Sequence, residues 1–393
     1  MMLNRLRFAR RNRSSRTLAL LAVMMSLLAI GYAWPAQAQA RNEEAPTVDQ
    51  PFRFFISGHS LTDNPLPEYI AAIAKSQGFQ VSWDQQIGIG APISWRTRGD
   101  NRKPGDWNGY HMGKNNGRQN MDVVAELRRG HEPVKYYTLI VAEAHHTAMV
   151  LRWNDTVRYL RHFHELLIQG NPRGTTYLYE PWEGIRDLSN PGPWMALERE
   201  ATKAWGCVVN RINHSLRHEG RKDSVKSLPI ASGLVHLVEK VTSEKVEGIS
   251  GSTTEETLRR IFSDDVHLVG LGRYYAALLS YTGISGRSPL GSWRPDFVTE
   301  RLATTLQEIA WSFYQERNRT YRSLSLQECV RHMADTFCDA WNSFTPGGKW
   351  GAIRVNDCVP YFSREDASLG RFEAQNPFVF DAAVDKQYWF PPP

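Results

Sequence analysis

Two segments far apart in the sequence hold residue types that could transfer an acyl group. In the first, Gly-His-Ser-Leu at residues 58–61, Ser60 follows an apolar run and precedes a helical pattern. In the second, Asp-Asp-Val-His at residues 264–267, Asp264 stands three residues before His267. A histidine can accept the proton of a serine, and an aspartate can fix its tautomer. We therefore expect Ser60 to be the nucleophile, His267 the general base and Asp264 its orienting partner.

Each segment taken alone has a plainer explanation. A serine between a strand and a helix is commonly a helix cap, and so is an aspartate before a surface histidine. The position of Ser60 nevertheless suits a nucleophile, because the start of a helix stabilises negative charge nearby.

Taken together, the two segments resemble the SGNH, or GDSL-type, hydrolase superfamily. The first block of that family, Gly-Asp-Ser-Leu, matches residues 58–61 with one departure, His59, and its Asp-x-x-His block matches residues 264–267 fully. The resemblance covers about residues 50–283 and implies a flavodoxin-like three-layer α/β/α domain with a Ser-His-Asp site.

This sequence matches the two middle blocks of the family less closely. Its glycine block is best matched by Gly90, with Gly88 a close competitor, and its Gly-x-Asn-Asp block is replaced by Glu-Ala-His-His at residues 143–146. His145 stands in the place of the asparagine. The resemblance therefore implies an oxyanion hole made by the backbone N–H groups of Ser60 and Gly90, with the imidazole of His145 as a further donor.

The elements that position these residues follow from periodicity. Short apolar runs alternate with amphipathic segments, which predicts an α/β fold with a parallel sheet of about five strands. The expected strands are residues 52–57, 79–83, 136–142, 175–179 and 225–231, and the expected helices are residues 67–76, 120–129, 154–169, 194–217 and 269–280. A loop over residues 96–119 should lie near the carboxyl ends of the strands, where open α/β sheets bind ligands.

The chain divides into four parts. Residues 1–40 combine arginines, an apolar run and an Ala-x-Ala ending, which predicts a signal peptide cleaved near Ala40; a retained membrane anchor is the alternative. Residues 41–50 form a linker and 51–283 the hydrolase-like domain. Residues 284–393 form a C-terminal extension, with helices expected at 296–318 and 325–342. The mature protein should be periplasmic or secreted, with no membrane association.

Export makes disulfide bonds feasible for the four cysteines. Cys329 and Cys338 share an expected helix, where they point in different directions and should not pair with each other. We expect one of them to bond to Cys358. Four buried thiols are the alternative.

Charge and histidine spacing exclude several partners. Six of the 47 basic residues and none of the 41 acidic ones lie in residues 1–40, so the remainder is formally neutral, which argues against nucleic acid. No histidine or cysteine spacing typical of a metal site occurs, and we expect neither metal nor cofactor.

The chain has 13 Trp, 15 Tyr and 16 Phe, and aromatic faces in a cleft suit stacking on sugar rings. Trp182 and Glu183, at the end of an expected strand, and Trp95 are the expected substrate-binding residues; core packing is the alternative for such tryptophans. The sequence thus predicts a serine esterase that removes acyl groups, acetyl foremost, from a carbohydrate. The alternatives are an O-acyltransferase with the same triad, an enzyme that cleaves glycosidic bonds with Glu143, Glu180 or Glu183, and a non-catalytic glycan-binding protein.

Overall fold

The computed structural model describes residues 51–98, 113–115, 118–345, 358–364 and 376–390. The expected signal peptide and linker lie outside these residues, as does the middle of the loop expected over residues 96–119. All of the described residues belong to one compact unit.

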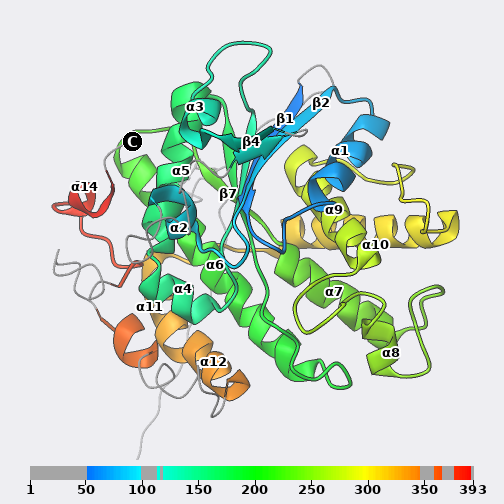
Figure 1. Ribbon diagram of the computed structural model, residues 1–393. Helices are drawn as coiled ribbons and strands as arrows, with labels where there is room; N and C mark the ends of the chain where they lie inside the picture. The colour runs from blue at the N-terminus through cyan, green and yellow to red at the C-terminus, as the bar shows by residue number, and fades with distance from the viewer. Residues whose placement is uncertain (1–50, 99–112, 116–117, 346–357, 365–375, 391–393) are drawn as a thin grey trace, which may run out of the picture. The chain divides into compact units, whose positions relative to one another are not determined.

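A twisted sheet forms the centre of this unit (Figure 1). Among the described residues it has seven strands in the order β4-β3-β2-β1-β5-β6-β7. The strands are β1 (Phe52–Gly58), β2 (Val81–Ile87), β3 (Gly113–Asn115), β4 (Arg118–Met121), β5 (Thr138–Ala142), β6 (Thr175–Tyr179) and β7 (Val225–Leu228). The five strands β2-β1-β5-β6-β7 are parallel, and β3 and β4 add an antiparallel hairpin at one edge. This order of the parallel strands is flavodoxin-like, which confirms the predicted fold class.

Helices cover both faces of the sheet (Figure 1). One face carries α1 (Leu66–Ser76), α7 (Ile230–Ser243) and α9 (Gly270–Ser285), with α8 (Thr254–Leu258) beside α7. The other carries α2 (Ile93–Arg98), α3 (Val123–Leu127), α4 (Thr147–Trp153), α5 (Thr156–Gly170) and α6 (Gly192–His218). The central strands are buried on both sides, and Phe54, Phe55 and Ile56 of β1 have no exposed surface.

The C-terminal extension is helical, as expected, and packs on helices of both faces. Helix α10 (Glu300–Thr320) lies against α7 and α9, whereas α11 (Leu326–His332), the π-helical turn η2 (Met333–Phe337) and α12 (Cys338–Phe344) form one helical stretch against α6. The short helix α14 (Asp385–Tyr388) follows near the end of the chain.

Two disulfide bonds join this extension to the rest of the chain and to itself. Cys338 bonds to Cys358, which confirms the expected bridge, and Cys207 of α6 bonds to Cys329 of α11. The alternative of four free thiols is therefore wrong.

Several sequence predictions need correction. The strand expected over residues 79–83 runs from Val81 to Ile87, and the described ends of the loop expected over residues 96–119 belong to α2, β3 and β4. The strand expected over residues 225–231 ends at Leu228, because Pro229 lacks an N–H for strand pairing and instead precedes α7, a helix the pattern did not predict. The helix expected from residue 120 begins at Val123, because residues 118–121 pair as β4. Across the described part of the chain, no helix is both long and apolar enough to span a membrane.

Candidate active site

A tight turn after β1 carries Ser60. The backbone N–H of His59 donates to Oγ1 of Thr62 at 3.1 Å, and the N–H of Thr62 donates to the carbonyl oxygen of His59 at 2.9 Å. A Cβ on Gly58 would lie 1.8 Å from that same Oγ1. Glycine is therefore required at position 58, because any side chain would displace the threonine that closes the turn.

His267 and Asp264 reach this turn from the loop between α8 and α9. Nε2 of His267 lies 3.0 Å from Oγ of Ser60, and its Nδ1 lies 2.8 Å from Oδ2 of Asp264. The structure thus brings together the three residues that the sequence analysis predicted to act together.

The loop that carries the histidine is held at several points. The backbone N–H of Ser263 donates to the carbonyl oxygen of His267 at 2.8 Å, which closes the loop on itself. Oδ1 of Asp264 accepts from the backbone N–H of Val266 at 2.8 Å and of His267 at 2.6 Å. Burial by itself raises the pKa of Asp264, but these hydrogen bonds and the ring of His267 outweigh it, so the pKa is lowered and the carboxylate stays charged.

This arrangement can move a proton away from a serine. A carboxylate accepts the Nδ1–H of His267, which leaves Nε2 unprotonated and facing Oγ of Ser60. Nε2 can then accept the hydroxyl proton as the oxygen attacks an electrophile, and Asp264 stabilises the imidazolium that forms.

Among the two glycines expected as oxyanion donors, Gly90 has the free N–H. The N–H of Gly88 donates to the carbonyl oxygen of Gly58 at 3.0 Å, and the N–H of Ala91 closes a turn onto Gly88 at 2.9 Å. Gly90 occupies the third position of that turn with a φ of +69°, a conformation that favours glycine. Within the described residues, the N–H groups of Gly90 and Ser60 have no hydrogen-bond acceptor, so both can donate to a ligand.

His145 follows β5 and lies close to the other histidines of the site. Its ring centroid is 6.4 Å from that of His59 and 4.4 Å from that of His146. Its Nδ1 is buried and has no partner among the described residues. Burial, followed by the charges of His146 and His267, lowers the pKa of His145, so the ring is neutral at pH 7. A neutral ring whose Nδ1 lacks an acceptor is best protonated at Nε2, where it can serve as a donor.

His59, the departure from the family motif, connects the serine turn to the segment after β5. The side chain is fully buried, and its Nε2 donates to the carbonyl oxygen of Glu143 at 2.7 Å. Burial, followed by the charge of Arg96, lowers the pKa of His59 to about 3, so the ring is neutral. The sequence analysis assigned His59 no role, although its position next to Ser60 could have indicated one.

The expected substrate-binding role of Trp182 and Glu183 needs correction. Trp182 is 1% exposed and Glu183 3%, so neither presents a surface to a ligand. Instead, Nε1 of Trp182 donates to the carbonyl oxygen of Val266 at 2.8 Å and supports the His267 loop. Trp95 is half-buried on α2, and its binding role stays a prediction.

Glu183 instead holds the start of α4. Its carboxylate accepts from the backbone N–H of Thr147 at 2.7 Å and lies 3.2 Å from Nδ1 of His146. His146 has a φ of 73°, which is uncommon for a residue other than glycine, and Glu183 stabilises this strained position directly after His145.

The carboxylates considered for glycosidic cleavage are all inside the protein. Glu143 and Glu180 have no exposed surface, and both accept hydrogen bonds from threonine hydroxyls, Thr156 at 2.6 Å and Thr202 at 3.1 Å. A pair of acids that flanks a glycosidic bond has to face the substrate, which these side chains do not.

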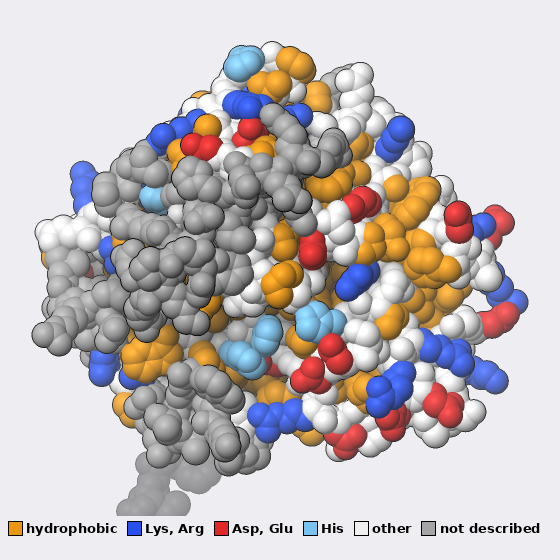
Figure 2. All heavy atoms as spheres, viewed as in Figure 1, with side chains coloured by type: hydrophobic (Ala, Val, Ile, Leu, Met, Phe, Trp, Pro, Cys, Tyr) orange, Lys and Arg blue, Asp and Glu red, His pale blue; other side chains and the backbone are white. Residues whose placement is uncertain are grey.

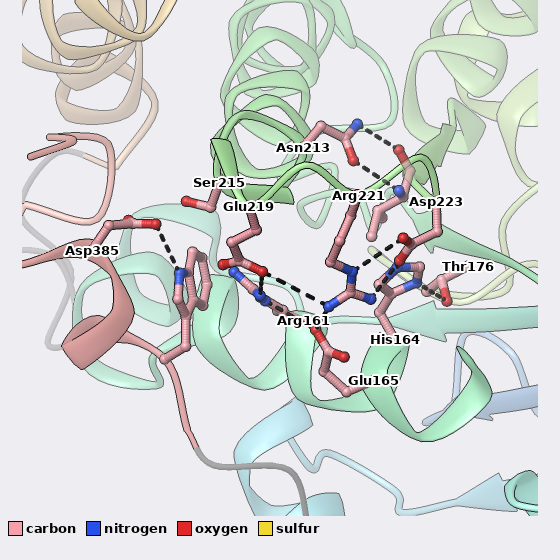
Figure 3. Close-up of polar contacts among 12 residues, drawn as sticks. Arg161, His164, Glu165, Thr176, Asn213, Ser215, Glu219, Arg221, Asp223 and Asp385 are labelled. Atoms are coloured by element: carbon pink, nitrogen blue, oxygen red, sulfur yellow. Dashed lines mark hydrogen bonds and ion pairs between the residues drawn. The ribbon is translucent and has the colours of Figure 1, made fainter. Parts of the chain in front are cut away.

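His164 belongs to a polar network near the starts of β6 and β7, at the end of the sheet opposite the candidate active site (Figure 3). Its Nδ1 lies 2.9 Å from Oγ1 of Thr176, near the start of β6, and its Nε2 lies 2.8 Å from Asp223, just before β7. Arg221 and Glu165 complete this network with an ion pair of 2.5 Å. Its role is structural, and the described residues contain no cluster of three or more metal-ligating side chains.

The charges on the surface are mixed. Figure 2 shows basic and acidic side chains interspersed over the described part of one face, together with a group of histidine side chains beside acidic ones. The side chains of His146 and His267 are 53% and 35% exposed, so a solute can reach both.

Comparisons with known proteins find little similarity in sequence. No protein-family model and no curated protein matches the chain. Among solved structures, a DUF4886 family protein from Bacteroides uniformis is similar with a TM-score of 0.46 and 12% identity, over 70% of this chain and 98% of that chain.

Proposed function

We propose that this protein is an exported serine esterase that hydrolyses acyl esters, acetyl esters of carbohydrates foremost, through Ser60, His267 and Asp264. The observation that supports it most is the continuous relay from Oγ of Ser60 through His267 to Asp264, with distances of 3.0 and 2.8 Å. The sequence resemblance to SGNH hydrolases, which rests on the blocks that hold these same three residues, agrees with this assignment.

The proposed reaction has two steps. Oγ of Ser60 attacks the ester carbonyl while Nε2 of His267 takes its proton, and the N–H groups of Ser60 and Gly90 together with His145 stabilise the oxyanion. The imidazolium then protonates the departing alcohol, which leaves an acyl-serine. Water, deprotonated by the same imidazole, releases the carboxylic acid and restores Ser60.

Two features support export. Residues 1–40 have the arginines, apolar run and small-residue ending of a signal peptide. The two disulfide bonds would persist in an oxidising compartment and not in a reducing one. A carbohydrate as the acyl carrier rests on the aromatic composition alone, with Trp95 the remaining candidate for stacking.

The proposal is tested by measuring release of p-nitrophenol from p-nitrophenyl acetate by residues 41–393. The Ser60→Ala variant should lose turnover, whereas a control variant at the exposed Ser243, Ser243→Ala, should keep it. Equal rates for wild type and Ser60→Ala, or no rate in a folded sample, would overturn the proposal. Acetylated oligosaccharides, analysed by mass with and without an acceptor sugar, would then separate hydrolysis from acyl transfer.

A further inference from the structure

Arg96 is a buried charge directly beneath the candidate active site. It lies on α2, and its side chain has no exposed surface. Arginine is almost never fully buried unless its donors are satisfied, because removing the guanidinium from water is costly. The groups that accept its hydrogen bonds therefore indicate the role of Arg96.

The guanidinium donates to the ends of three separate segments. Nε donates to Oγ of Ser57 at 3.1 Å and Nη2 to the carbonyl oxygen of Ser57 at 3.3 Å, both at the end of β1. Nη1 donates to the carbonyl oxygen of Ala91 at 2.5 Å. Nη2 also donates to the carbonyl oxygen of Ala142, the last residue of β5.

Each of these acceptors lies within three residues of a group of the site. Ser57 is three residues before Ser60, Ala91 directly follows Gly90, and Ala142 is three residues before His145. We infer that Arg96 is a positioning residue that sets the mutual spacing of the three oxyanion donors by binding all three segments at once. This inference rests on the proposed function.

Neighbouring polar groups fix the guanidinium in this position. The side chain of Gln86 donates to the carbonyl oxygen of Arg96 at 2.7 Å and accepts from Oγ of Ser57 at 2.7 Å. Glu143, also fully buried, supplies the opposite charge and accepts from the backbone N–H of Ile93, the first residue of α2, at 3.0 Å. Burial lowers the pKa of Arg96 to about 10 while the charge of Glu143 opposes this, so the guanidinium is protonated at pH 7.

A lysine cannot replace this arrangement. The guanidinium is a planar fork with five N–H donors, whereas a lysine has one nitrogen on a flexible stem and cannot reach three segments in fixed directions. Arg96→Lys thus keeps the charge and removes the shared geometry. Arg211 offers a matched control: it is 2% exposed, it bonds to Asp385 at 2.5 Å, and it lies on α6 and not at the strand ends.

The experiment compares wild type, Arg96→Lys, Arg96→Met and Arg211→Lys by melting temperature, by kcat and KM for p-nitrophenyl acetate, and by the rate at which a fluorophosphonate labels Ser60. Both Arg96 variants should lower kcat and the labelling rate by about 30 to 100-fold, because small misplacements of catalytic groups cost about that much. KM should change by less than about threefold, since oxyanion donors act mainly in the transition state. Arg211→Lys should lower the melting temperature and leave kcat per folded molecule unchanged.

The outcomes separate this inference from the proposed function. If the wild type labels at Ser60 and turns over substrate, but Arg96→Lys does so equally fast, the positioning role is wrong and the esterase stands. If Arg96→Lys and Arg211→Lys lose activity only in proportion to the unfolded fraction, Arg96 is merely structural. If the wild type shows neither labelling nor turnover, the proposed function fails and this inference with it.

Discussion

Asp264 and His267 contact each other through both the backbone and the side chain. Oδ1 of Asp264 accepts the backbone N–H of His267 at 2.6 Å, while Oδ2 lies 2.8 Å from Nδ1 of its ring. One carboxylate therefore fixes the position of the residue and the orientation of its imidazole together. The three-residue spacing makes this double contact feasible, since a capping aspartate reaches the N–H three residues ahead.

Asp264→Asn tests this double contact. The amide oxygen can still cap the backbone, but the amide nitrogen cannot accept from Nδ1, so the ring should take the wrong tautomer. We expect kcat for p-nitrophenyl acetate to fall by about 10² to 10⁴-fold with little change in melting temperature. Asp265→Asn, one residue along and also exposed, is the matched control and should retain activity. Full activity in Asp264→Asn would show that His267 does not need this partner.

His145 can be tested by two substitutions that differ in their ability to donate. His145→Ala removes the imidazole and should lower kcat by about 10² to 10³-fold, the usual effect of losing one oxyanion donor. His145→Asn supplies an amide N–H at the same place and should recover part of the loss. Steady-state kinetics of both variants check this. An equal loss in both would indicate that His145 acts by packing or by charge.

The sequence predicted the fold and the central relay well because both depend on local signals. The apolar runs that form β1, β5 and β6 are buried on both faces, and such strands are readable from composition. Ser60 directly follows an expected strand and His267 precedes an expected helix, and at these positions a serine and a histidine are recognisable as candidate catalytic residues. Their 3.0 Å approach brings the turn after β1 together with the loop between α8 and α9.

The supporting residues could not be predicted because their roles depend on burial. Trp182 has the residue type of a sugar-stacking side chain, but it is buried, and its indole N–H donates to the carbonyl oxygen of Val266 in the loop between α8 and α9. Arg96 appeared to begin a polar loop, whereas its side chain turns inward and bonds to three segments that are distant in the chain. Long-range contacts of this kind leave no periodic pattern in the sequence.

Gly58→Ala is expected to be more damaging than its size suggests. The added Cβ would lie 1.8 Å from Oγ1 of Thr62, so the threonine has to leave the turn that presents Ser60. We expect a clash of this kind to cost about 1 to 3 kcal/mol of stability and most of the activity. Thermal melting and esterase assays measure both. Gly192→Ala, at the start of α6, is the control, because neither glycine has a positive φ and a Cβ at position 192 would meet only Oδ1 of Asn190, at 3.3 Å.

The two disulfide bonds should contribute unequally to stability. Cys207 and Cys329 are 122 residues apart and Cys338 and Cys358 only 20, so the first bond restricts the unfolded chain more. Chain-entropy arguments give about 5 kcal/mol for the first and about 3 kcal/mol for the second as upper values. Urea unfolding of Cys207→Ser/Cys329→Ser and of Cys338→Ser/Cys358→Ser measures the difference. A greater loss from the second pair would contradict this reasoning.

The buried ring of His59 should make the protein less stable in mild acid. Its pKa is about 3 in the folded state, below the ordinary value of 6.5, so between these two pH values the unfolded chain binds more protons than the folded one. The free energy of unfolding therefore falls as the pH drops, and this one group accounts for about 2 kcal/mol between pH 7 and pH 5. His59→Asn has no titrating group and should show a correspondingly smaller loss in urea unfolding at the two pH values, with the exposed His131→Asn as control. Equal losses in His59→Asn and wild type would mean that His59 is not held neutral in the folded protein.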